Sequence, residues 1–276
     1  MFSVTKAIPI LLLWCVPVTL HAGPAPFRVC ADPNNMPYSN RQQRGFENRL
    51  AQIMARDLGR PLAYVWFPQR ENFFDKTLNA GLCDAVMSVP AGFDDVTATS
   101  PYYRSSYVFV SRRDRGLNVT SFDDVRLRSL HIGVQILGDG DDNLPPVFAL
   151  NSRGIIRNVQ GYSIFGGRLD SSDPQQDLIN AVAGGIIDIA VAWGPMAGYF
   201  AKRTTAPLTI TPVASDPAHP DLPLAFDIAI GVRKGDRALA HRLNTALIRH
   251  RLEIQRTLHS YGLPTADATQ PPSQEN

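Results

Sequence analysis

The sequence predicts an α/β protein made of two lobes that are joined by two crossings of the chain. Short apolar strands alternate with amphipathic helices over most of the chain, and this alternation restarts after a charged segment at residues 111–115. A proline-rich turn at residues 216–223 is expected to carry the chain back to the first lobe. We therefore predict lobe 1 over residues 27–111 and 222–264, and lobe 2 over residues 112–221.

The first 22 residues have the pattern of a cleaved secretory signal peptide. Lys6 precedes an apolar run from residue 8 to residue 20, and Ala22 offers a small side chain at the expected cleavage point. This run is too short to span a bilayer, which needs about 20 apolar residues. We expect an exported mature chain that does not insert into the membrane, and a disordered polar tail over residues 265–276.

The overall composition excludes several classes of protein. With 276 residues and 44% hydrophobic content, the chain is long enough for one large or two modest cores. The 27 Lys and Arg residues nearly balance the 25 Asp and Glu residues, which gives a formal net charge of +2. Nucleic-acid binding depends on clustered basic residues, and none are clustered here, so no nucleic-acid partner is expected.

The first strand, loop and helix are predicted to form one wall of a ligand cleft. Apolar and polar residues alternate over residues 27–31, and two prolines end the strand in a shaped loop at residues 32–38. From Phe46 the apolar positions repeat every three to four residues up to Gly59, which is the pattern of an amphipathic helix with a glycine stop. Such units bind ligands beyond the carboxyl ends of their strands, so the loop is expected to face a cleft.

The remaining elements follow the same alternation of strand and helix. Strands at residues 62–67 and 84–89 flank a short helix at residues 72–80. Because right-handed parallel crossovers are the default, these strands and the first one should form one sheet with helices on both faces. Further on, strands are expected at 107–110, 131–136, 157–162, 186–192, 208–213 and 226–232. Helices are expected after the loop at 138–143 with Pro145 in the first turn, over 174–183, from 193 to about 202, and from 237 onward.

Two cysteines remain after removal of the signal peptide, which contains Cys15. Cys30 and Cys83 form an even pair, and an even pair in an oxidising compartment favours a disulfide. Two buried thiols are the alternative, because Cys30 lies late in one strand and Cys83 at the start of another, and a bridge requires Cα atoms that lie close together. We predict the disulfide.

No catalytic or metal-binding motif in the sequence is complete. The acidic loop at residues 138–143 spaces its oxygen atoms as a calcium loop does, but it lacks the required glycine and closing glutamate, so a helix cap is the better interpretation. His241, His250 and His259 are nine residues apart and are expected on the surface of a helix. We therefore predict no metal, no cofactor and no enzyme activity.

Four acidic residues bear on that prediction. Glu47 is interpreted as a cap of the helix that begins near Gly45, and Asp188 as a structural residue early in its strand. A lyase or dehydratase built on the same fold would need an acid/base pair in the cleft. Asp94 and Asp95 are the candidates, provided that the structure shows one of them buried with a raised pKa.

Several aromatic and amide side chains fall where strands end and loops begin, the positions that would ring a pocket between the lobes. Asp94 joins them because its loop follows the carboxyl end of the third strand. For each residue the alternative is a structural role: turn capping for the asparagines and core packing for the aromatic rings. The predicted cleft set is Asn34, Asn35, Tyr38, Asp94, Tyr102, Tyr103, Gln135 and Trp193.

Three long stretches resemble one family of periplasmic proteins. They are VCADPNNMPYSN at residues 29–40, PYYRSSYVFV at residues 101–110 and DIAVAWGPMAGYF at residues 188–200. The whole mature chain resembles the two-lobed, type II periplasmic solute-binding proteins. These stretches look like the branch that is associated with quinoprotein dehydrogenases, the MoxJ/XoxJ type.

The resemblance implies a periplasmic accessory protein that helps a dehydrogenase dependent on pyrroloquinoline quinone (PQQ), acting on methanol or another alcohol, to mature or become active. The implied partner is that dehydrogenase, with its cytochrome c as a further candidate, and a small-molecule ligand of the cleft is an additional expectation. The alternative function is the substrate-binding protein of an ABC importer for a small solute.

Amino acids are not the expected ligands. The amino-acid-binding members of the wider family clamp the α-carboxylate with an arginine after the third strand and the ammonium with an aspartate in the second lobe. The corresponding positions here hold Phe93 and Asp94 in the first place and Trp193 in the second. An acidic residue repels a carboxylate, and an indole offers an ammonium group only its π face.

Overall fold

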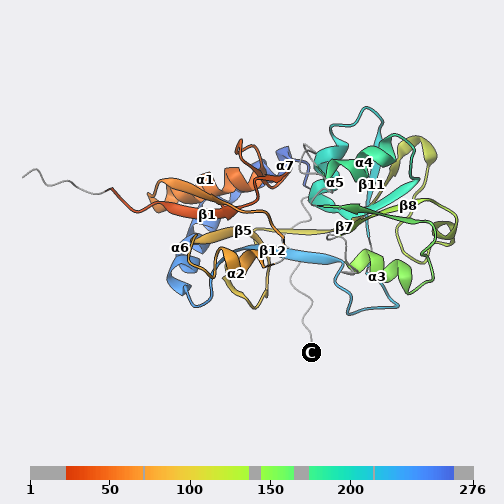
Figure 1. Cartoon of the computed structure of the whole chain (residues 1–276). Coiled ribbons are helices and arrows are strands. Elements are labelled where there is room, and N and C mark those ends of the chain that lie inside the picture. The colour runs from red at the N-terminus through yellow and green to blue at the C-terminus, as the bar shows by residue number, and fades with distance from the viewer. Residues whose placement is uncertain (1–22, 71, 137–143, 165–173, 214, 264–276) are drawn as a thin grey trace, which may run out of the picture.

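Two α/β lobes lie side by side and are joined by two long strands in the computed structural model (Figure 1). The structure describes residues 23–70, 72–136, 144–164, 174–213 and 215–263. The predicted signal peptide, acidic loop and polar tail fall outside these residues. One mixed sheet runs through both lobes in the order β4-β1-β5-β12-β7-β10-β8-β9, and β6 and β11 pair beside this path.

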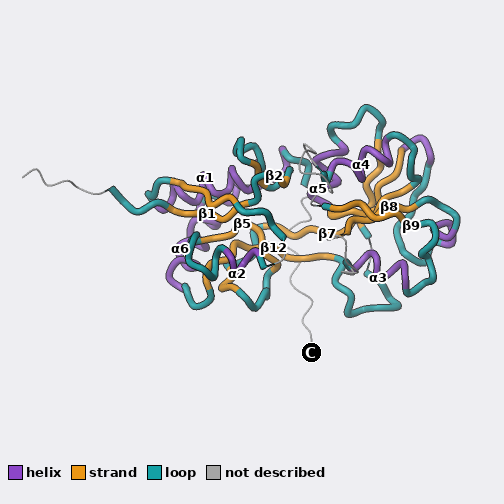
Figure 2. Tube along the Cα trace, in the orientation of Figure 1, coloured by secondary structure: helices purple, strands orange, loops and turns teal. Residues whose placement is uncertain are grey.

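Lobe 1 is built on three parallel strands. β1 (Phe27–Ala31) lies between β4 (Leu62–Trp66) and β5 (Ala85–Pro90), and Cys30 is in register with Val65 on one side and Val86 on the other. The predicted parallel pairing of these strands is confirmed. Helices cover both faces, as Figure 2 shows: α1 (Phe46–Leu58), α6 (Arg237–Arg249) and α7 (Arg251–Ser260) pack in one apolar cluster, and α2 (Phe73–Lys76) in another.

The ends of these helices follow the sequence in one case and depart from it in another. Gly59 ends α1 in the left-handed conformation with φ 64°, as a glycine stop requires. The single helix expected from residue 237 is wrong, because the chain breaks at His250 and forms two helices. His250 is also not an ordinary surface residue: its Nε2 lies 2.9 Å from the Asp57 carboxylate, and its imidazole side chain is 21% exposed.

Two strands carry the chain between the lobes. β7 (Tyr103–Arg112) pairs with β12 (Ala225–Arg233) over residues 103–106, and then with β10 and β11 over residues 107–112. The change of partner lies between Ser106 and Tyr107, inside one continuous strand. The lobe boundaries at residues 111/112 and 221/222 stay a prediction.

Lobe 2 repeats the layered design. Its strands are β8 (Ile132–Ile136), β9 (Val159–Ser163), β10 (Ile189–Trp193) and β11 (Leu208–Pro212). Helices α4 (Gln176–Ala183) and α5 (Gly194–Ala201) pack with one face of this sheet, and α3 (Pro145–Asn151) with the other.

The short elements of the chain are β2 (Asn34–Asn35), β3 (Ser39–Asn40), β6 (Val96–Ala98), η1 (Arg113–Arg115) and η2 (Val125–Arg128). None of the described helices is long and apolar enough to span a membrane.

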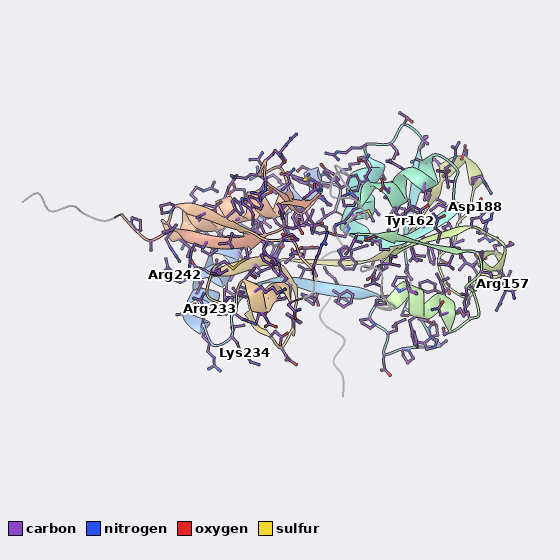
Figure 3. All side chains as sticks on the ribbon, in the orientation of Figure 1. Arg157, Tyr162, Asp188, Arg233, Lys234 and Arg242 are labelled. Atoms are coloured by element: carbon purple, nitrogen blue, oxygen red, sulfur yellow. A yellow bond between two sulfur atoms is a disulfide. The ribbon has the colours of Figure 1, made fainter. Side chains whose placement is uncertain are left out.

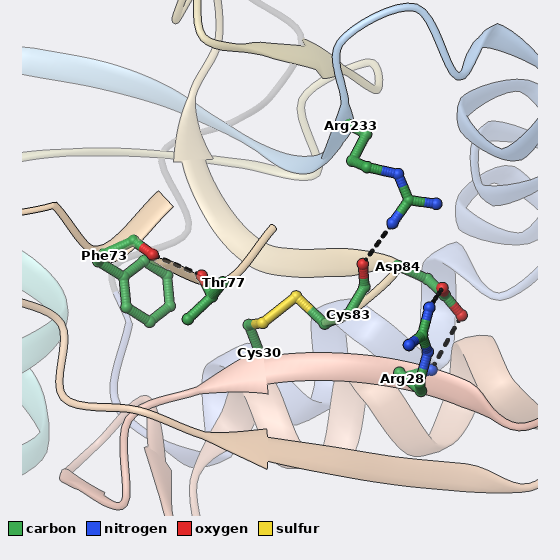
Figure 4. The surroundings of a disulfide bond; sticks show 7 residues. All are labelled: Arg28, Cys30, Phe73, Thr77, Cys83, Asp84 and Arg233. Atoms are coloured by element: carbon green, nitrogen blue, oxygen red, sulfur yellow. Dashed lines mark hydrogen bonds and ion pairs between the residues drawn. A yellow bond between two sulfur atoms is a disulfide. The ribbon is translucent and has the colours of Figure 1, made fainter. Parts of the chain in front are cut away.

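A disulfide joins Cys30 of β1 to Cys83, just before β5 (Figure 4). The predicted bridge is confirmed: the two Cα atoms are 5.6 Å apart although the residues are 53 positions apart in the chain. Next to it, the Asp84 carboxylate forms ion pairs with Nη2 of Arg28 at 2.9 Å and with Nη2 of Arg60 at 2.8 Å. These contacts hold the start of β5 against the start of β1 and against the turn before β4.

We expect the variant with C30A and C83A to lose roughly 4 kcal/mol of unfolding free energy, because the bridge closes a long loop and thereby restricts the unfolded chain. Denaturant titration of the oxidised protein and the double variant measures the difference. The reduced wild-type protein is the control for lost side-chain packing and should match the variant. Equal midpoints for oxidised and reduced protein would show that the bridge adds no stability.

A buried ion pair holds the segment that returns to lobe 1. Asp216, whose side chain has no exposed surface, accepts hydrogen bonds from both guanidinium nitrogens Nη1 and Nη2 of Arg153, at 2.9 and 2.6 Å. His219 Nδ1 lies 3.2 Å from the same carboxylate. The bonds from Arg153 and His219 hold the pKa of Asp216 well below its usual range. Arg153 lies in the turn just after α3, so this pair ties the return segment to lobe 2.

D216N should destabilise the protein by roughly 3 kcal/mol at neutral pH, because the change leaves a buried guanidinium without its main counter-charge. The Asp216 pKa is lowered on folding, so its contribution is present above the unfolded pKa of about 3.8 and is lost as the pH falls below it. Chemical unfolding of both proteins at neutral and acidic pH measures this. D123N removes the exposed second partner of Arg153 and should cost less than 1 kcal/mol; a cost equal to that of D216N would refute the assignment.

Candidate functional site

A cavity of about 290 Å³ lies between the two lobes. Lobe 1, β7 and β12 supply most of its wall, and lobe 2 supplies the rest. The lining side chains are mainly aromatic, aliphatic or amide, with a single carboxylate. They are Asn35, Tyr38, Glu47, Gln69, Ser88, Val89, Pro90, Tyr103, Tyr107, Gln135, Leu144, Ile164, Gln175, Trp193, Phe226 and Ile228.

The loop after β1 brings Asn35 and Tyr38 to this cavity. Two prolines end the strand, and the chain folds into the small β2-β3 hairpin instead. Asp32, buried at the end of β1, holds the hairpin by accepting bonds from the backbone N–H groups of Asn34 and Gln69, each at 2.7 Å. Asn35 Nδ2 then donates to Gln69 Oε1 at 2.9 Å. The hairpin that carries Asn35 is therefore held by the Asp32 carboxylate, and the Asn35 side chain is held by Gln69.

The N-terminus of α1 lies directly against this hairpin. The N–H groups of Phe46 and Glu47 donate to the carbonyl oxygens of Pro37 and Tyr38, at 2.9 and 3.0 Å. A Cβ atom on Gly45 would lie 1.8 Å from the Tyr38 oxygen, so only glycine allows this approach. The contact points the Glu47 side chain inward, where it is 5% exposed.

The interpretation of Glu47 as a helix cap is wrong. Asn48 fills that role, because its Oδ1 accepts from the backbone N–H groups of Gly45 and Asn40, at 3.0 and 3.2 Å. Glu47 instead lines the cavity. Burial raises its pKa to about 7, a hydrogen bond from Ser88 opposes the rise, and the nearby Asp32 carboxylate adds to it.

Aromatic rings dominate the opposite part of the cavity. The Trp193 ring packs edge to face with Tyr107 and with Phe226, at centroid distances of 5.3 and 5.7 Å. Gln135 Oε1 accepts the backbone N–H of Trp193 at 2.7 Å, which fixes the residue at the junction of β10 and α5. Burial raises the pKa of Tyr107 to about 12, so this phenol is neutral at physiological pH.

The lobes touch across the cavity. Gln175 of lobe 2 donates its amide Nε2 to Asn35 Oδ1 of the hairpin. Gln175 is 8% exposed, so this contact is shielded from solvent. The pair closes one side of the cavity with polar groups that could also turn toward a ligand.

The structure brings five of the eight predicted cleft residues together: Asn35, Tyr38, Tyr103, Gln135 and Trp193 all line the cavity. Asn34 and Asp94 are exposed and lie outside its lining, because the hairpin and the turn after β5 direct them elsewhere. Tyr102 is also outside: its hydroxyl donates to the Met87 carbonyl at 2.9 Å on the neighbouring strand. A binding role for any of these residues stays a prediction.

Sequence reasoning missed several lining residues. Phe226 and Tyr107 lie within recognisable strands, but their direction depends on the β7-β12 pairing, which no local pattern reveals. Glu47 had a signal, because the residues three, four and seven positions after it in the helix, at 50, 51 and 54, are all apolar, which places Glu47 on the inward side of that helix. Asp188 was assigned correctly as structural: it accepts the His131 backbone N–H at 2.8 Å, and Figure 3 places it in the outer part of lobe 2.

The lining residues offer no clamp for an amino acid. None of them is Arg, Lys or His, so the described part of the chain provides no cation in the cavity for an α-carboxylate. Nor do the described residues contain a group of three or more His, Cys, Asp or Glu side chains placed to hold a metal ion. Asp94 and Asp95 are both exposed, so neither meets the condition set for a catalytic acid. The cavity is suited to a ligand whose apolar or aromatic part contacts the rings and whose polar part contacts the one carboxyl group and the several amides of the lining.

E47Q should change how stability depends on pH. The folded pKa of Glu47 is raised from 4.5 to about 7, so its stabilising effect is complete below the unfolded value and is lost as the pH rises through 7. Relative to E47Q, the wild type should lose on the order of 3 kcal/mol between about pH 4 and about pH 8. Denaturant unfolding across this range measures the effect. D94N, at an exposed position, is the control and should follow the wild-type curve; parallel curves for E47Q would contradict the assignment.

No family model matches the chain, but individual proteins do. Protein MoxJ of Methylorubrum extorquens is 30% identical over 243 residues, which cover 86% of this chain and 80% of MoxJ. The crystal structure of the periplasmic binding protein XoxJ from Methylobacterium extorquens AM1 has a TM-score of 0.71 at 32% identity and covers 87% of this chain and 98% of XoxJ.

A second solved structure agrees with the first. MxaJ from Methlophaga aminisulfidivorans MPT has a TM-score of 0.73 at 28% identity, with coverage of 87% of this chain and 99% of MxaJ. Likeness at this level over both lobes confirms the predicted two-lobed periplasmic-binding-protein fold. The chain therefore belongs to the MoxJ family, the same family that its sequence motifs indicate.

Proposed function

We propose that the protein acts in the periplasm as a non-enzymatic accessory of a PQQ-dependent methanol or alcohol dehydrogenase, and that it supports the maturation or activation of that enzyme. The observation that carries this proposal is the similarity to MoxJ, XoxJ and MxaJ over both lobes. A dehydrogenase partner is what the resemblance of the sequence motifs to this family implies.

The lining of the cavity argues against a function in amino-acid transport. Amino-acid capture needs a cation for the carboxylate, and the described lining residues supply none. The position that would hold the ammonium ligand in lobe 2 is Trp193, an aromatic residue that packs against Tyr107 and Phe226. A scaffold that has lost the amino-acid clamp while keeping both lobes fits a protein that serves a partner enzyme.

A second function, the solute receptor of an ABC importer, is favoured by one specific observation. Four amide side chains converge on the cavity: Asn35, Gln69, Gln135 and Gln175. The bond between Gln175 and Asn35 joins the lobes across it. Convergent polar groups of this kind suit a small molecule better than a macromolecular segment.

Recovery of a quinoprotein from periplasmic extract with the tagged, exported protein tests the accessory function. Dehydrogenase activity per mole of enzyme is assayed before and after addition of the purified protein. We expect the enzyme to co-purify and its activity to rise until the added protein is equimolar, because an accessory acts through a stoichiometric complex.

A periplasmic binding protein of the same fold from outside this family is the matched control, and it should leave the activity unchanged. Two outcomes decide against the accessory function: no quinoprotein is recovered, or the control stimulates equally. If, in addition, a small molecule raises the melting temperature of the isolated protein, the importer function is supported instead.

A further inference from the structure

Glu47 differs from three other low-exposure carboxylates described in this chain, each of which pairs with a basic side chain. A fourth, Asp32, has no basic partner among the described residues but accepts hydrogen bonds from the backbone N–H groups of Asn34 and Gln69. Asp84 pairs with Arg28 and Arg60, and Asp216 pairs with Arg153. Asp57 likewise pairs with Arg249 and His250. Buried acids normally keep such partners, because an unpaired buried charge is costly.

Within the described residues, no Arg, Lys or His forms an ion pair with Glu47. Its carboxylate receives a hydrogen bond from Ser88. The ionisable groups that interact electrostatically with Glu47 are Asp32 after β1, Tyr64 on β4, and Tyr38, Tyr102 and Tyr103. All of these are neutral or negative. Among the described residues, the cavity therefore has a carboxylate and no positive group that balances it.

The rest of the cavity is suited to a cation. Tyr38, Tyr103, Tyr107, Trp193 and Phe226 present aromatic rings to it. The negative face of an aromatic ring attracts an organic cation, most strongly where water is excluded. The amide oxygens of the lining can accept hydrogen bonds from an ammonium group.

We propose that this cavity binds a small organic cation of the alkylammonium class, with its charge beside the Glu47 carboxylate and its carbon atoms against the aromatic rings. Binding completes the ion pair that Glu47 lacks. The ligand class is independent of the dehydrogenase proposal, because it depends on the cavity alone.

Isothermal titration of the purified mature protein with choline and with 3,3-dimethylbutan-1-ol, the uncharged isostere of choline, tests the proposal. n-Butylammonium serves as a second, less bulky cation. We expect the cations to bind roughly ten-fold or more tightly than the alcohol. Equal affinity for the alcohol, or no binding of either cation to natively folded protein, would overturn the proposal.

The pH dependence gives a second readout. A cation needs ionised Glu47, whose pKa in the free protein is about 7, so affinity should rise roughly ten-fold from about pH 6 to about pH 8. In E47Q the affinity should fall to that of the alcohol and lose its dependence on pH. D94N, at an exposed position outside the cavity, is the matched control and should bind as the wild type does.

A measurement of proton release by the wild-type protein tests the proposal even if E47Q does not fold. Titration of the wild type with choline near pH 7, in two buffers of different ionisation enthalpy, reports the protons released on binding. Release of about half a proton per ligand is expected, because about half of the Glu47 carboxyls are protonated at their pKa. No release would contradict binding at Glu47. If the protein binds choline but does not stimulate a dehydrogenase, the ligand proposal stands and the accessory function does not.

Discussion

The pairing of β7 with β12 is the constraint on which the rest of the structure depends. Ala225 faces Ser106 and Ile228 faces Tyr103 across this antiparallel ladder, and beyond it β7 continues into the sheet of lobe 2. Because both lobes attach to the same two strands, their separation and orientation are set by backbone hydrogen bonds. The floor of the cavity, which includes Tyr103, Tyr107 and Phe226, is made by these strands themselves.

Further contacts between the lobes lie beside that ladder. A Cβ atom on Gly198 of α5 would lie 2.1 Å from the Gly262 oxygen after α7, so helix and turn meet backbone to backbone. Next to this point the rings of Tyr199 and Tyr261 stack at a centroid distance of 5.8 Å. Together with the bond from Gln175 to Asn35, these contacts join the lobes at points outside the β7-β12 ladder. A ligand or a partner segment that enters the cavity meets the Gln175 and Asn35 side chains, which both line it.

Charge placement separates the structural parts of the molecule from its cavity. Ion pairs with arginine fix Asp84 at the start of β5 and Asp216 on the return segment, where they tie distant parts of the chain together. Glu47 is as buried as these residues, but it lines the cavity together with aromatic rings and amides. A fold that needed Glu47 only for stability would gain from a partner or an apolar replacement. Its position is therefore better explained by what enters the cavity than by what holds the lobes.

The sequence by itself determined most strands and helices, the disulfide pair and the family, because these depend on local periodicity, on glycine and proline positions and on extended motifs. It also placed Asn35, Tyr38, Tyr103, Gln135 and Trp193 near strand ends, where a cleft forms. Only the tertiary structure decided which side chains face the cavity. The direction of Glu47 follows from the packing of Gly45 on Tyr38, and the removal of Tyr102 from the cavity follows from its bond to Met87. Such contacts join residues through backbone geometry that no local pattern encodes.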